Sequence, residues 1–476
     1  MINHIQELQY ITPELIIGFG IFIAVIFEMF LKKSEVILPW LSILVFLAAG
    51  LYSLFTLNIR AVVFNDMFST GGIPGIFNCI FTFGAFLVVL SSKDYIKKYG
   101  SYYGEYYIMI LSSVLGMMLM AGAKDLFIIF LGLELMSICF YVLAGINRNK
   151  TSANEASLKY FLLGAFATGF IVYGIALIYG SSQTTNLEII ISQFGNLITN
   201  VLFIVGMLLF LIGFSFKIAA FPFHMWVPDV YQGSSSTVAG LMSTGGKAAA
   251  FSVLIIALGA IFPGINKNLF EPYFAVIATL SMLYGSIVAI AQSNLKRMLA
   301  YSSIAHAGYM SIGLAAGNYA SIAGIIFYLA AYTFMNLGAF GIISIVEGKD
   351  DSHLELKDYA GLAGKHPVLA GFMSLFMFAL AGLPPFAGFF GKYYVFVAAI
   401  ESNLTWLAVL GVLSSIISVY FYIRVVVNMY FRESESDFQI ERNRSGVFSI
   451  VVAGIIVILI GLFPGSILDL IVSFIK

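Results

Sequence analysis

Charged residues are scarce in this chain: they make up 10% of its 476 residues, against 60% hydrophobic residues and a mean hydropathy of +0.97. A soluble globular domain carries about 25% charged residues, so this composition excludes that class of protein. The short alternating segments of an outer-membrane barrel are also missing. Instead, apolar stretches of about 20 residues recur, each long enough to cross roughly 30 Å of hydrocarbon as a helix. The sequence therefore predicts an all-α, polytopic membrane protein.

Groups that bind metals, nucleotides or redox cofactors are equally scarce. Cys79 and Cys139 are the two cysteines, and they are too few and too far apart for a zinc site or an iron–sulfur cluster. The five histidines show no metal-ligand spacing, and neither GxGxxG at a strand-to-helix turn nor GxxxxGK[ST] occurs. We expect no metal, nucleotide or redox cofactor in this chain and no nucleic-acid partner. Any energy source must then be external to it.

About fourteen membrane spans are predicted from the apolar stretches. The first is expected to be retained, because the residues before it lack the basic region and cleavage site of a signal peptide. The predicted spans lie near 11–31, 36–57, 72–91, 106–123, 125–146, 156–180, 197–221, 234–262, 270–292, 298–316, 319–346, 366–400, 404–431 and 446–472.

The basic residues in the connecting loops predict the orientation, because loops on the inside of the membrane are enriched in lysine and arginine. With the N-terminus outside, four basic residues fall outside: Arg60, Lys124, Lys267 and Lys476. Fifteen fall inside: Lys32, Lys33, Lys93, Lys97, Lys98, Arg148, Lys150, Lys296, Arg297, Lys349, Lys357, Lys365, Arg432, Arg442 and Arg444. Both termini are therefore predicted on the periplasmic side.

Five basic residues lie inside predicted spans: Lys159, Lys217, Lys247, Lys392 and Arg424. A charge near the bilayer centre costs about 2.5–3.5 kcal/mol, so such residues normally face the bundle interior and mark an ion or proton path. The alternative is snorkelling, in which a long side chain reaches the membrane surface. Snorkelling suits Lys159 and Arg424, which lie near span ends, better than Lys217 beside a proline. It suits Lys247 and Lys392, deep in their spans, least.

An acidic residue and two histidines lie at similar depth. Glu134 in "IIFLGLELMSICF" is about 14 Å into its span, where a carboxylate needs a partner or a proton. His306 in "AYSSIAHAGYM" is near the middle of its span, and its imidazole suits a proton relay, although a structural histidine is the alternative. His224 follows Lys217 by two helical turns, but Pro222 between them breaks the helical geometry.

Prolines and glycines interrupt two of the spans beside their lysines. "AAFPFHMWVP" follows Lys217, and "AGLPPFAGFFGK" ends on Lys392. Proline kinks are common in membrane helices, but paired interruptions in two halves of a chain are typical of transporters built from inverted repeats with ion sites at the bilayer midplane. We expect the seventh and twelfth spans to be discontinuous.

The segments "FKIAAFPFHMWVPDVYQGSSSTVAGLMSTGGKAAAF", "LKRMLAYSSIAHAGYM" and "GLPPFAGFFGKYYVF" resemble the antiporter-like membrane subunits of proton-pumping NADH:quinone oxidoreductase, respiratory complex I. The resemblance extends over nearly the whole chain. Within the group it is greatest for the subunit N family, because of "HMWVPDVY" and a lysine at position 392.

This resemblance implies one membrane domain, 1–476, with three N-terminal helices in 1–100, inverted five-helix repeats in 101–265 and 266–432, and a fourteenth helix in 433–476. It implies a proton path through Glu134, Lys217, Lys247, His306 and Lys392, with Lys159 as a further lysine. It also implies that the chain is a proton-translocating subunit of a translocase in the bacterial inner membrane. FMN, iron–sulfur clusters and quinone would then belong to partner subunits of the membrane arm and beyond.

Two other functions use similar features. A subunit of a multi-protein sodium/proton antiporter has comparable helices but no redox partner. A solitary solute carrier is expected to have a pocket with converging polar groups, whereas this sequence has mostly lysines and carboxylates in succession. Association with a flavin and iron–sulfur module distinguishes the first interpretation from both.

Overall fold

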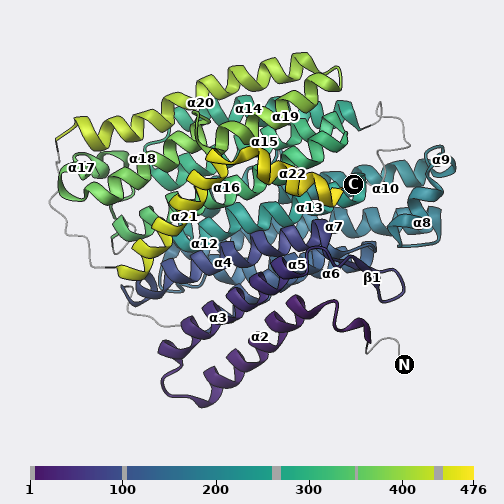
Figure 1. Ribbon diagram of the computed structural model, residues 1–476, viewed down its shortest axis with the longest axis horizontal. Coiled ribbons are helices and arrows are strands. Elements are labelled where there is room, and N and C mark those ends of the chain that lie inside the picture. The colour runs from purple at the N-terminus through teal and green to yellow at the C-terminus, as the bar shows by residue number, and fades with distance from the viewer. Residues whose placement is uncertain (1–5, 99–103, 260–269, 349–351, 434–442, 476) are drawn as a thin grey trace.

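The computed structural model describes residues 6–98, 104–259, 270–348, 352–433 and 443–475. Within these ranges the chain is a bundle of helices with one short two-stranded hairpin (Figure 1). Four of the basic residues used to predict the orientation lie outside the described residues: Lys267, Lys349, Arg442 and Lys476.

Three long helices and the hairpin form the N-terminal part of the bundle. The hairpin pairs Ala61 with Thr70 and connects the second helix to the third. The elements are α2 (Thr12–Phe30), α3 (Ser34–Phe55), β1 (Ala61–Val63), β2 (Phe68–Thr70) and α4 (Gly72–Lys98).

The first repeat contains the seventh span, which is broken as predicted. Its two halves are α10 and α11, separated by a non-helical segment after Lys217. The elements are α5 (Glu105–Gly122), α6 (Leu126–Ala144), α7 (Thr151–Ser182), α8 (Leu187–Ser192), α9 (Phe194–Leu197), α10 (Val201–Lys217), α11 (Trp226–Gly233), α12 (Ser236–Leu241), the π-helix η1 (Met242–Gly246) and α13 (Lys247–Gly259).

The second repeat contains the other broken span, formed by α18 and α19. Its elements are α14 (Glu271–Ile290), α15 (Leu295–Ala316), α16 (Tyr319–Val346), the 3-10 helix η3 (Leu356–Tyr359), α17 (Leu362–Lys365), α18 (Pro367–Ala381), α19 (Ala387–Glu401) and α20 (Thr405–Phe431). Two C-terminal helices follow, α21 (Arg444–Leu462) and α22 (Pro464–Ile475).

Each of the fourteen predicted spans corresponds to helical structure, and 11 of the described helices are long and apolar enough to cross a membrane. The last predicted span, 446–472, differs in detail. It is two helices rather than one, because α21 ends at Leu462 and Pro464 begins α22. A proline favours such a break because it lacks the backbone N–H and its ring clashes with the preceding turn.

A pair of backbone bridges shows that the two five-helix sets repeat each other. Asp125, the N-cap of α6, forms an isolated antiparallel bridge with Asn186, and Asn294, the N-cap of α15, forms one with Glu355. The partners are equally far apart in sequence, and two hydrogen bonds of 2.8–2.9 Å between flanking residues close each bridge. The helix α8, which follows the first bridge, and the helix α17, which follows the second bridge after η3, lie at opposite ends of the bundle (Figure 1). The repeats are therefore inverted.

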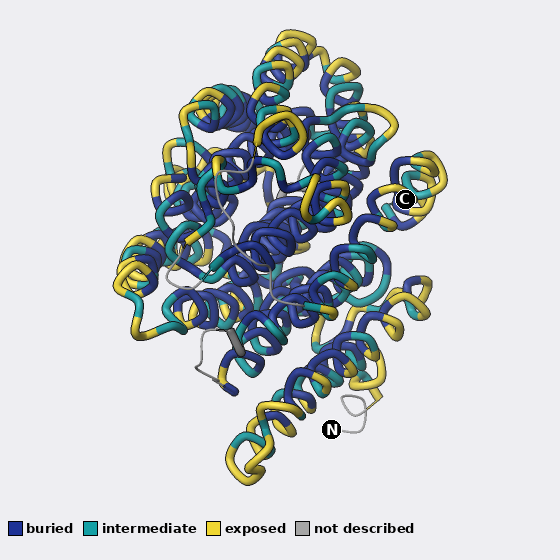
Figure 2. Tube along the Cα trace, turned by 90° about the vertical axis from the view of Figure 1, so that its left-hand side faces the viewer, coloured by how far each residue is buried: buried dark blue, intermediate teal, exposed yellow. Residues whose placement is uncertain are grey.

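The most buried helices lie at the centre of the bundle, and the exposed segments form its rim (Figure 2). In α16 and in the α12–α13 segment, 94% of the most apolar window is buried, against 28% in α2 and α7. The rim carries large apolar side chains such as Phe22, Phe30, Phe55 and Phe166, which are 64–81% exposed. Lipid tails solvate such side chains, so the apolar rim agrees with a bundle embedded in a bilayer.

Candidate functional site

Lys217 is the last residue of α10, at the break in the seventh span, and only 6% of it is exposed. Its Nζ donates hydrogen bonds to Ser137 Oγ (2.9 Å) and to the Tyr141 hydroxyl (3.4 Å) on α6. The C-terminal end of a helix carries partial negative charge from unpaired carbonyl groups, which favours an ammonium group there. The break therefore creates a position where a buried lysine is stabilised.

Glu134 lies one turn before Ser137 on the same helix, so the structure places it beside the group that Lys217 binds. Its Oε1 accepts a hydrogen bond from Thr168 Oγ1 on α7 (2.9 Å). Within the described residues, the hydrogen bonds of Lys217 go to Ser137 and Tyr141, and no ion pair joins it to Glu134. The Ser137 hydroxyl, which Lys217 binds one turn from Glu134, can both donate and accept a hydrogen bond.

Lys247 directly follows the π-helix η1 and is 2% exposed. Its Nζ donates to Ser303 Oγ (2.6 Å) and to the Ser303 carbonyl oxygen, both on α15 of the second repeat. A π-helical turn inserts an extra residue into a helix and shifts the direction of the following side chains, and such turns occur frequently at functional sites. This turn lies immediately before the lysine that connects the two repeats.

His306, which is 2% exposed, lies one turn after Ser303 on α15. Its two ring nitrogens face two phenol groups: Nδ1 is 2.7 Å from the Tyr328 hydroxyl and Nε2 is 2.9 Å from the Tyr422 hydroxyl. The Tyr422 hydroxyl also hydrogen-bonds Ser302. A neutral imidazole has one donor and one acceptor nitrogen, so one tyrosine donates and the other accepts.

Lys392 on α19 is 4% exposed, and its Nζ donates to the Ala381 carbonyl (2.9 Å) and to Ser415 Oγ (2.8 Å). Ala381 is the last residue of α18, so the break in the twelfth span exposes the carbonyl that this lysine needs. Gly382 follows with φ of +84°, and a Cβ there would lie 3.1 Å from Lys392 Nζ. Both the backbone conformation and the approach of the lysine require glycine at this position.

The helix α15 joins these groups because Ser302, Ser303, His306 and Tyr309 recur at helical spacing on it. Tyr309 lies under Lys392, whose Nζ is 4.8 Å from the ring centroid, and its hydroxyl donates to Ser414 (3.2 Å). One face of α15 thus contacts Lys247 through Ser303 near the middle of the helix and Lys392 through Tyr309 further along. The structure therefore brings Lys247, His306 and Lys392 together around a single helix.

Lys159 on α7 lies at the edge of the bundle, with 42% of its side chain exposed. Its Nζ forms ion pairs with Glu155 (2.7 Å) and with Asp229 (2.9 Å) on α11. Asp229 also binds Arg297 of α15 (2.7 Å), which connects the two repeats at this edge. A cavity of about 380 Å³ opens beside the cluster, lined by Ser152, Glu155, Lys159, Asp229, Asn294, Glu355 and neighbouring residues.

Two predicted residues lie away from these groups. His224 is 5% exposed, but its ring lies against Phe221 (5.2 Å) and Tyr284 (4.6 Å), and no hydrogen bond to its Nδ1 is found within the described residues. The helix break separates it from Lys217, so the two residues do not share a helix face. Arg424 donates to the carbonyls of Ile290 and Gln292 at the end of α14, where it acts as a helix cap.

A buried ion pair escaped the sequence interpretation. Lys296 was assigned to an inside loop, but it is fully buried and binds Glu347 at the end of α16 (3.2 Å) and the Ser234 carbonyl (2.8 Å). The hydroxyls of Tyr95 and Ser236 donate to the other Glu347 oxygen (2.8 and 2.6 Å). The pair thereby ties the joint between α11 and α12 in the first repeat to α15 and α16 in the second. The residues next to Lys296 in the sequence gave no signal that Lys296 is buried.

The hydroxyl groups around the charges also escaped notice, because serine and tyrosine in an apolar helix are common and carry no distinctive spacing. A possible signal is the run "YSSIAHAGYM", which places hydroxyls one turn before and one turn after His306. Among the described residues, no group of three or more His, Cys, Asp or Glu side chains converges as metal ligands would. The arrangement holds ammonium, imidazole and hydroxyl groups, which exchange protons.

The chain matches known proteins over almost its whole length. Residues 123–418 match the family described as "NADH:quinone oxidoreductase/Mrp antiporter, TM". NADH-quinone oxidoreductase subunit N of Trichlorobacter lovleyi is 45% identical over 91% of this chain and 89% of the relative. Subunit N 1 of Chloroherpeton thalassium is 44% identical over 94% of both chains.

Solved structures give the same result. A chain of respiratory complex I from Thermus thermophilus with bound aureothin has a TM-score of 0.82 and 31% identity, covering 96% of this chain and 98% of that one. A chain of the Mrp complex from Dietzia sp. has a TM-score of 0.85 over 97% and 96%, but at 18% identity it shows the shared fold alone. The resemblance seen in the sequence is confirmed, and this chain belongs to the NADH-quinone oxidoreductase subunit N family of antiporter-like membrane proteins.

Proposed function

We propose that this chain is the proton-translocating subunit N of an NADH:quinone oxidoreductase, in which electron transfer in partner subunits drives proton movement through this one. The subunit N relatives at 44–45% identity support the assignment to that complex. The observation that supports proton movement is the contact of Lys247 with Ser303, which links a buried lysine of one repeat to the helix of His306 in the other.

The proposed proton path starts at Lys217. Burial destabilises the ammonium form of a lysine, and a nearby carboxylate stabilises it. A movement or neutralisation of Glu134 would therefore change whether Lys217 holds or releases its proton. Ser137 contacts Lys217 and lies one turn from Glu134, so it is placed to transmit a small displacement of either group.

The path continues through Lys247 to Lys392. Serine and tyrosine hydroxyls donate and accept at the same time, so a hydrogen-bonded row of them relays a proton without carrying a full charge. Ser303 accepts a hydrogen bond from Lys247, and the Tyr422 hydroxyl hydrogen-bonds both Ser302 and His306. Tyr309 lies between His306 and the Lys392 ammonium group, with ring contacts of 5.7 and 4.8 Å. In this proposal Lys392 passes the proton on to the far side.

The cavity beside Lys159 and Asp229 is the proposed site of proton uptake. It is lined by charged and polar side chains from both repeats, so it can fill with water. In the orientation predicted from the basic residues, it opens on the inside of the membrane. Lys159 would then act at the surface of this cavity rather than in the buried path, while His224 has a packing role.

The remaining assignments follow from this one. We place three helices in 1–100, the repeats in 101–265 and 266–432, and the last span in 433–476, all in the inner membrane of a bacterium with both termini in the periplasm. FMN, iron–sulfur clusters and quinone belong to partner subunits in this proposal. The immediate partners are neighbouring membrane-arm subunits and the lipid bilayer.

Purification of the tagged chain from its native membrane tests the assignment. We expect it to co-migrate with flavin and iron–sulfur clusters and to support NADH-driven proton uptake into proteoliposomes. A Lys247→Ala complex should keep the redox module but lose much of the proton uptake. Purification without flavin and clusters would contradict the proposal. Sodium-dependent flux in such a preparation would instead support the multi-protein antiporter, for which the Mrp complex provides a shared fold alone.

A further inference from the structure

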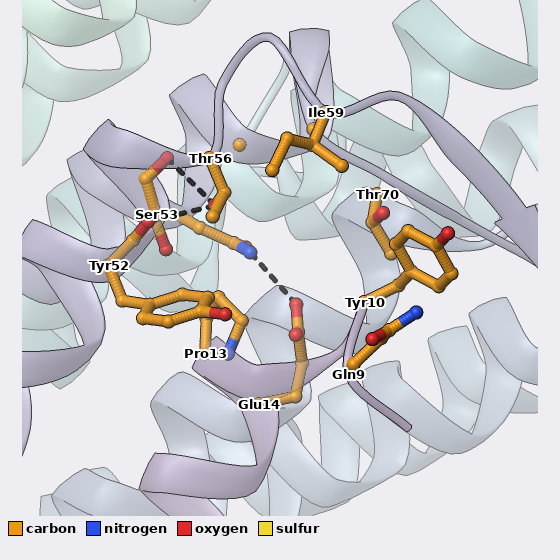
Figure 3. Close-up of a pocket in the computed structure, with 12 residues that line it drawn as sticks. Gln9, Tyr10, Pro13, Glu14, Tyr52, Ser53, Thr56, Ile59 and Thr70 are labelled. Atoms are coloured by element: carbon orange, nitrogen blue, oxygen red, sulfur yellow. Dashed lines mark hydrogen bonds between the residues drawn. The ribbon is translucent and has the colours of Figure 1, made fainter. Parts of the chain in front are cut away.

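A second polar cavity, of about 320 Å³, lies outside both repeats, among the three N-terminal helices (Figure 3). It is bounded by the first turn of α2, the last turns of α3, the first turns of α4 and the hairpin strand β2. The proton path proposed above uses no residue of these helices. The cavity therefore needs a separate explanation.

Glu14 and Asn78 form the polar wall of this cavity. They are 6% and 5% exposed, and Asn78 Nδ2 donates to Glu14 Oε1 at 2.8 Å. Figure 3 shows the Glu14 carboxyl group pointing into the centre of the cavity. The second carboxylate oxygen, Oε2, and Asn78 Oδ1 are both buried and accept no hydrogen bond within the described part of the chain. A buried carboxylate with an unpaired oxygen is costly, so a donor is missing from this site.

The other lining groups are suited to accept hydrogen bonds from a cation. None of them carries a positive charge that could neutralise an anion. The hydroxyls of Ser53 and Thr56 donate to the backbone carbonyls of Ala49 and Tyr52, which leaves their lone pairs free. The lining residues are Gln9, Tyr10, Pro13, Glu14, Tyr52, Ser53, Thr56, Ile59, Thr70, Gly71, Gly75 and Asn78, and none is basic. The complementary ligand is a cationic group with several N–H donors.

The position of the cavity indicates where this group comes from. Ends of spanning helices lie near the bilayer surface, where tyrosines such as Tyr10 and Tyr52 are enriched. Beside the cavity, α3 exposes a row of apolar side chains that lipid tails can cover: Leu51 (46%), Leu54 (47%) and Phe55 (81%). Lipid headgroups and the upper acyl chains occupy this level of the membrane.

We propose that the cavity binds the ammonium headgroup of an ethanolamine phospholipid, with its acyl chains along α3. A primary ammonium group carries three N–H donors, enough for Glu14 Oε2, Asn78 Oδ1 and one hydroxyl. Choline has methyl groups in place of these donors. An anionic glycerol headgroup would face the Glu14 carboxylate without a cation to neutralise it. The ethanolamine lipid would anchor the first three helices to each other.

A photoactivatable ethanolamine phospholipid, reconstituted with the whole purified complex, tests this proposal. Cross-linked peptides are mapped by mass spectrometry, and unlabelled ethanolamine, choline and glycerol phospholipids compete. We expect cross-links in 9–14 and 51–59 that the ethanolamine lipid alone suppresses. Glu14→Gln should lower them several-fold, while Glu35→Gln, at the exposed opposite end of α3, should not. Proton uptake should be unchanged in both variants, which separates this proposal from the proposed function.

Thr70→Leu provides a second variant in case Glu14→Gln does not assemble, because it narrows the cavity and leaves Glu14 and Asn78 in place. It should also lower the cross-links several-fold. Equal competition by the choline lipid would show that the site does not select the primary ammonium group. Labelling that neither variant changes would show that the lipid binds elsewhere, and either result would overturn the proposal. Suppression by free ethanolamine as strong as by the lipid would also overturn it, since the ligand would then be a soluble amine.

Discussion

Lys247 Nζ donates a hydrogen bond to Ser303 Oγ at 2.6 Å, and this contact crosses from the first inverted repeat to the second. Both residues are buried, so solvent does not reach this contact from either repeat. In the proposed path it is the step at which a proton passes between repeats. The step depends on the hydroxyl of one serine.

Ser303→Ala should therefore slow proton pumping by about tenfold while the complex still assembles, because a hydrogen bond to a charged group contributes about 1.5–3 kcal/mol. Ser311→Ala is the matched control, since Ser311 is buried on the same helix but its hydroxyl binds its own backbone at Ala307. Proton uptake into proteoliposomes, measured per NADH oxidised, compares the two. Equal uptake in both variants would remove Ser303 from the path.

Lys392→Ala should leave assembly intact and lower pumping by about tenfold or more, since a positioned proton-transfer group contributes about 10²-fold or more. The change removes an ammonium group that bridges the end of α18 and α20. Lys357→Ala, an exposed lysine outside the spans, is the control. If the assembled Lys392→Ala complex pumps normally, Lys392 is a structural charge.

The orientation predicts which loops are reachable from the periplasm. A cysteine at Asn65, exposed in the hairpin turn, should react with a membrane-impermeant maleimide in intact spheroplasts. A cysteine at Lys357, exposed near η3, should react after permeabilisation alone. The reverse pattern would invert the topology and with it the sidedness of the cavity beside Lys159.

The buried pair Lys296 and Glu347 should behave differently from a surface pair. Lys296→Met or Glu347→Gln alone leaves a buried charge unpaired, which costs about 3–5 kcal/mol, while replacing both with methionine should cost less than the sum. Lys124→Met is the control, because its pair with Glu188 is partly exposed and exposed pairs contribute about 0–1 kcal/mol. Thermal unfolding of the purified complex gives the comparison. A small, equal effect of Lys296→Met and Lys124→Met would contradict the buried pairing.

The sequence predicted the spans and the buried lysines because both are local signals. A 20-residue apolar run identifies a helix, and Lys247 or Lys392 within such a run is conspicuous. The partners of these lysines are not local: Lys392 binds Ser415, and Lys296 binds Glu347 from another helix. Lys296 looked like a loop residue because it stands beside Arg297 and polar residues, but α16 and the joint between α11 and α12 pack against it and bury it.

The helix breaks were also predictable from local sequence, whereas the contacts made at them were not. Prolines after Lys217 and before Lys392 predicted that both spans are interrupted. They did not predict that Ala381 would present its carbonyl to Lys392, because that depends on how α19 folds back against the end of α18. The π-helix before Lys247 had no sequence signal beyond two adjacent glycines, Gly245 and Gly246.

Glu134 and Lys217 should act as one unit in proton pumping, although Ser137 rather than a direct ion pair connects their surroundings. If Glu134 controls the charge of Lys217, then loss of either residue disables the same step. We expect Glu134→Gln and Lys217→Ala each to lower quinone-dependent pumping, and the double variant to be little worse than either single change. The coupling energy should lie in the range of about 0.5–3 kcal/mol that is typical of interacting residues.

The double variant Glu134→Gln, Lys357→Ala is the comparison for the Glu134→Gln, Lys217→Ala variant. Lys357 is exposed outside the spans, so its change should act independently of Glu134→Gln. Ser137→Ala tests the connection itself: it removes the hydroxyl that Lys217 binds while both charges remain. If Ser137 transmits the displacement of Glu134, this variant should pump more slowly and Glu134→Gln should add little to it. Additive losses for Glu134→Gln and Lys217→Ala would show that the two residues serve separate steps, and the switch would then have to lie elsewhere in the first repeat.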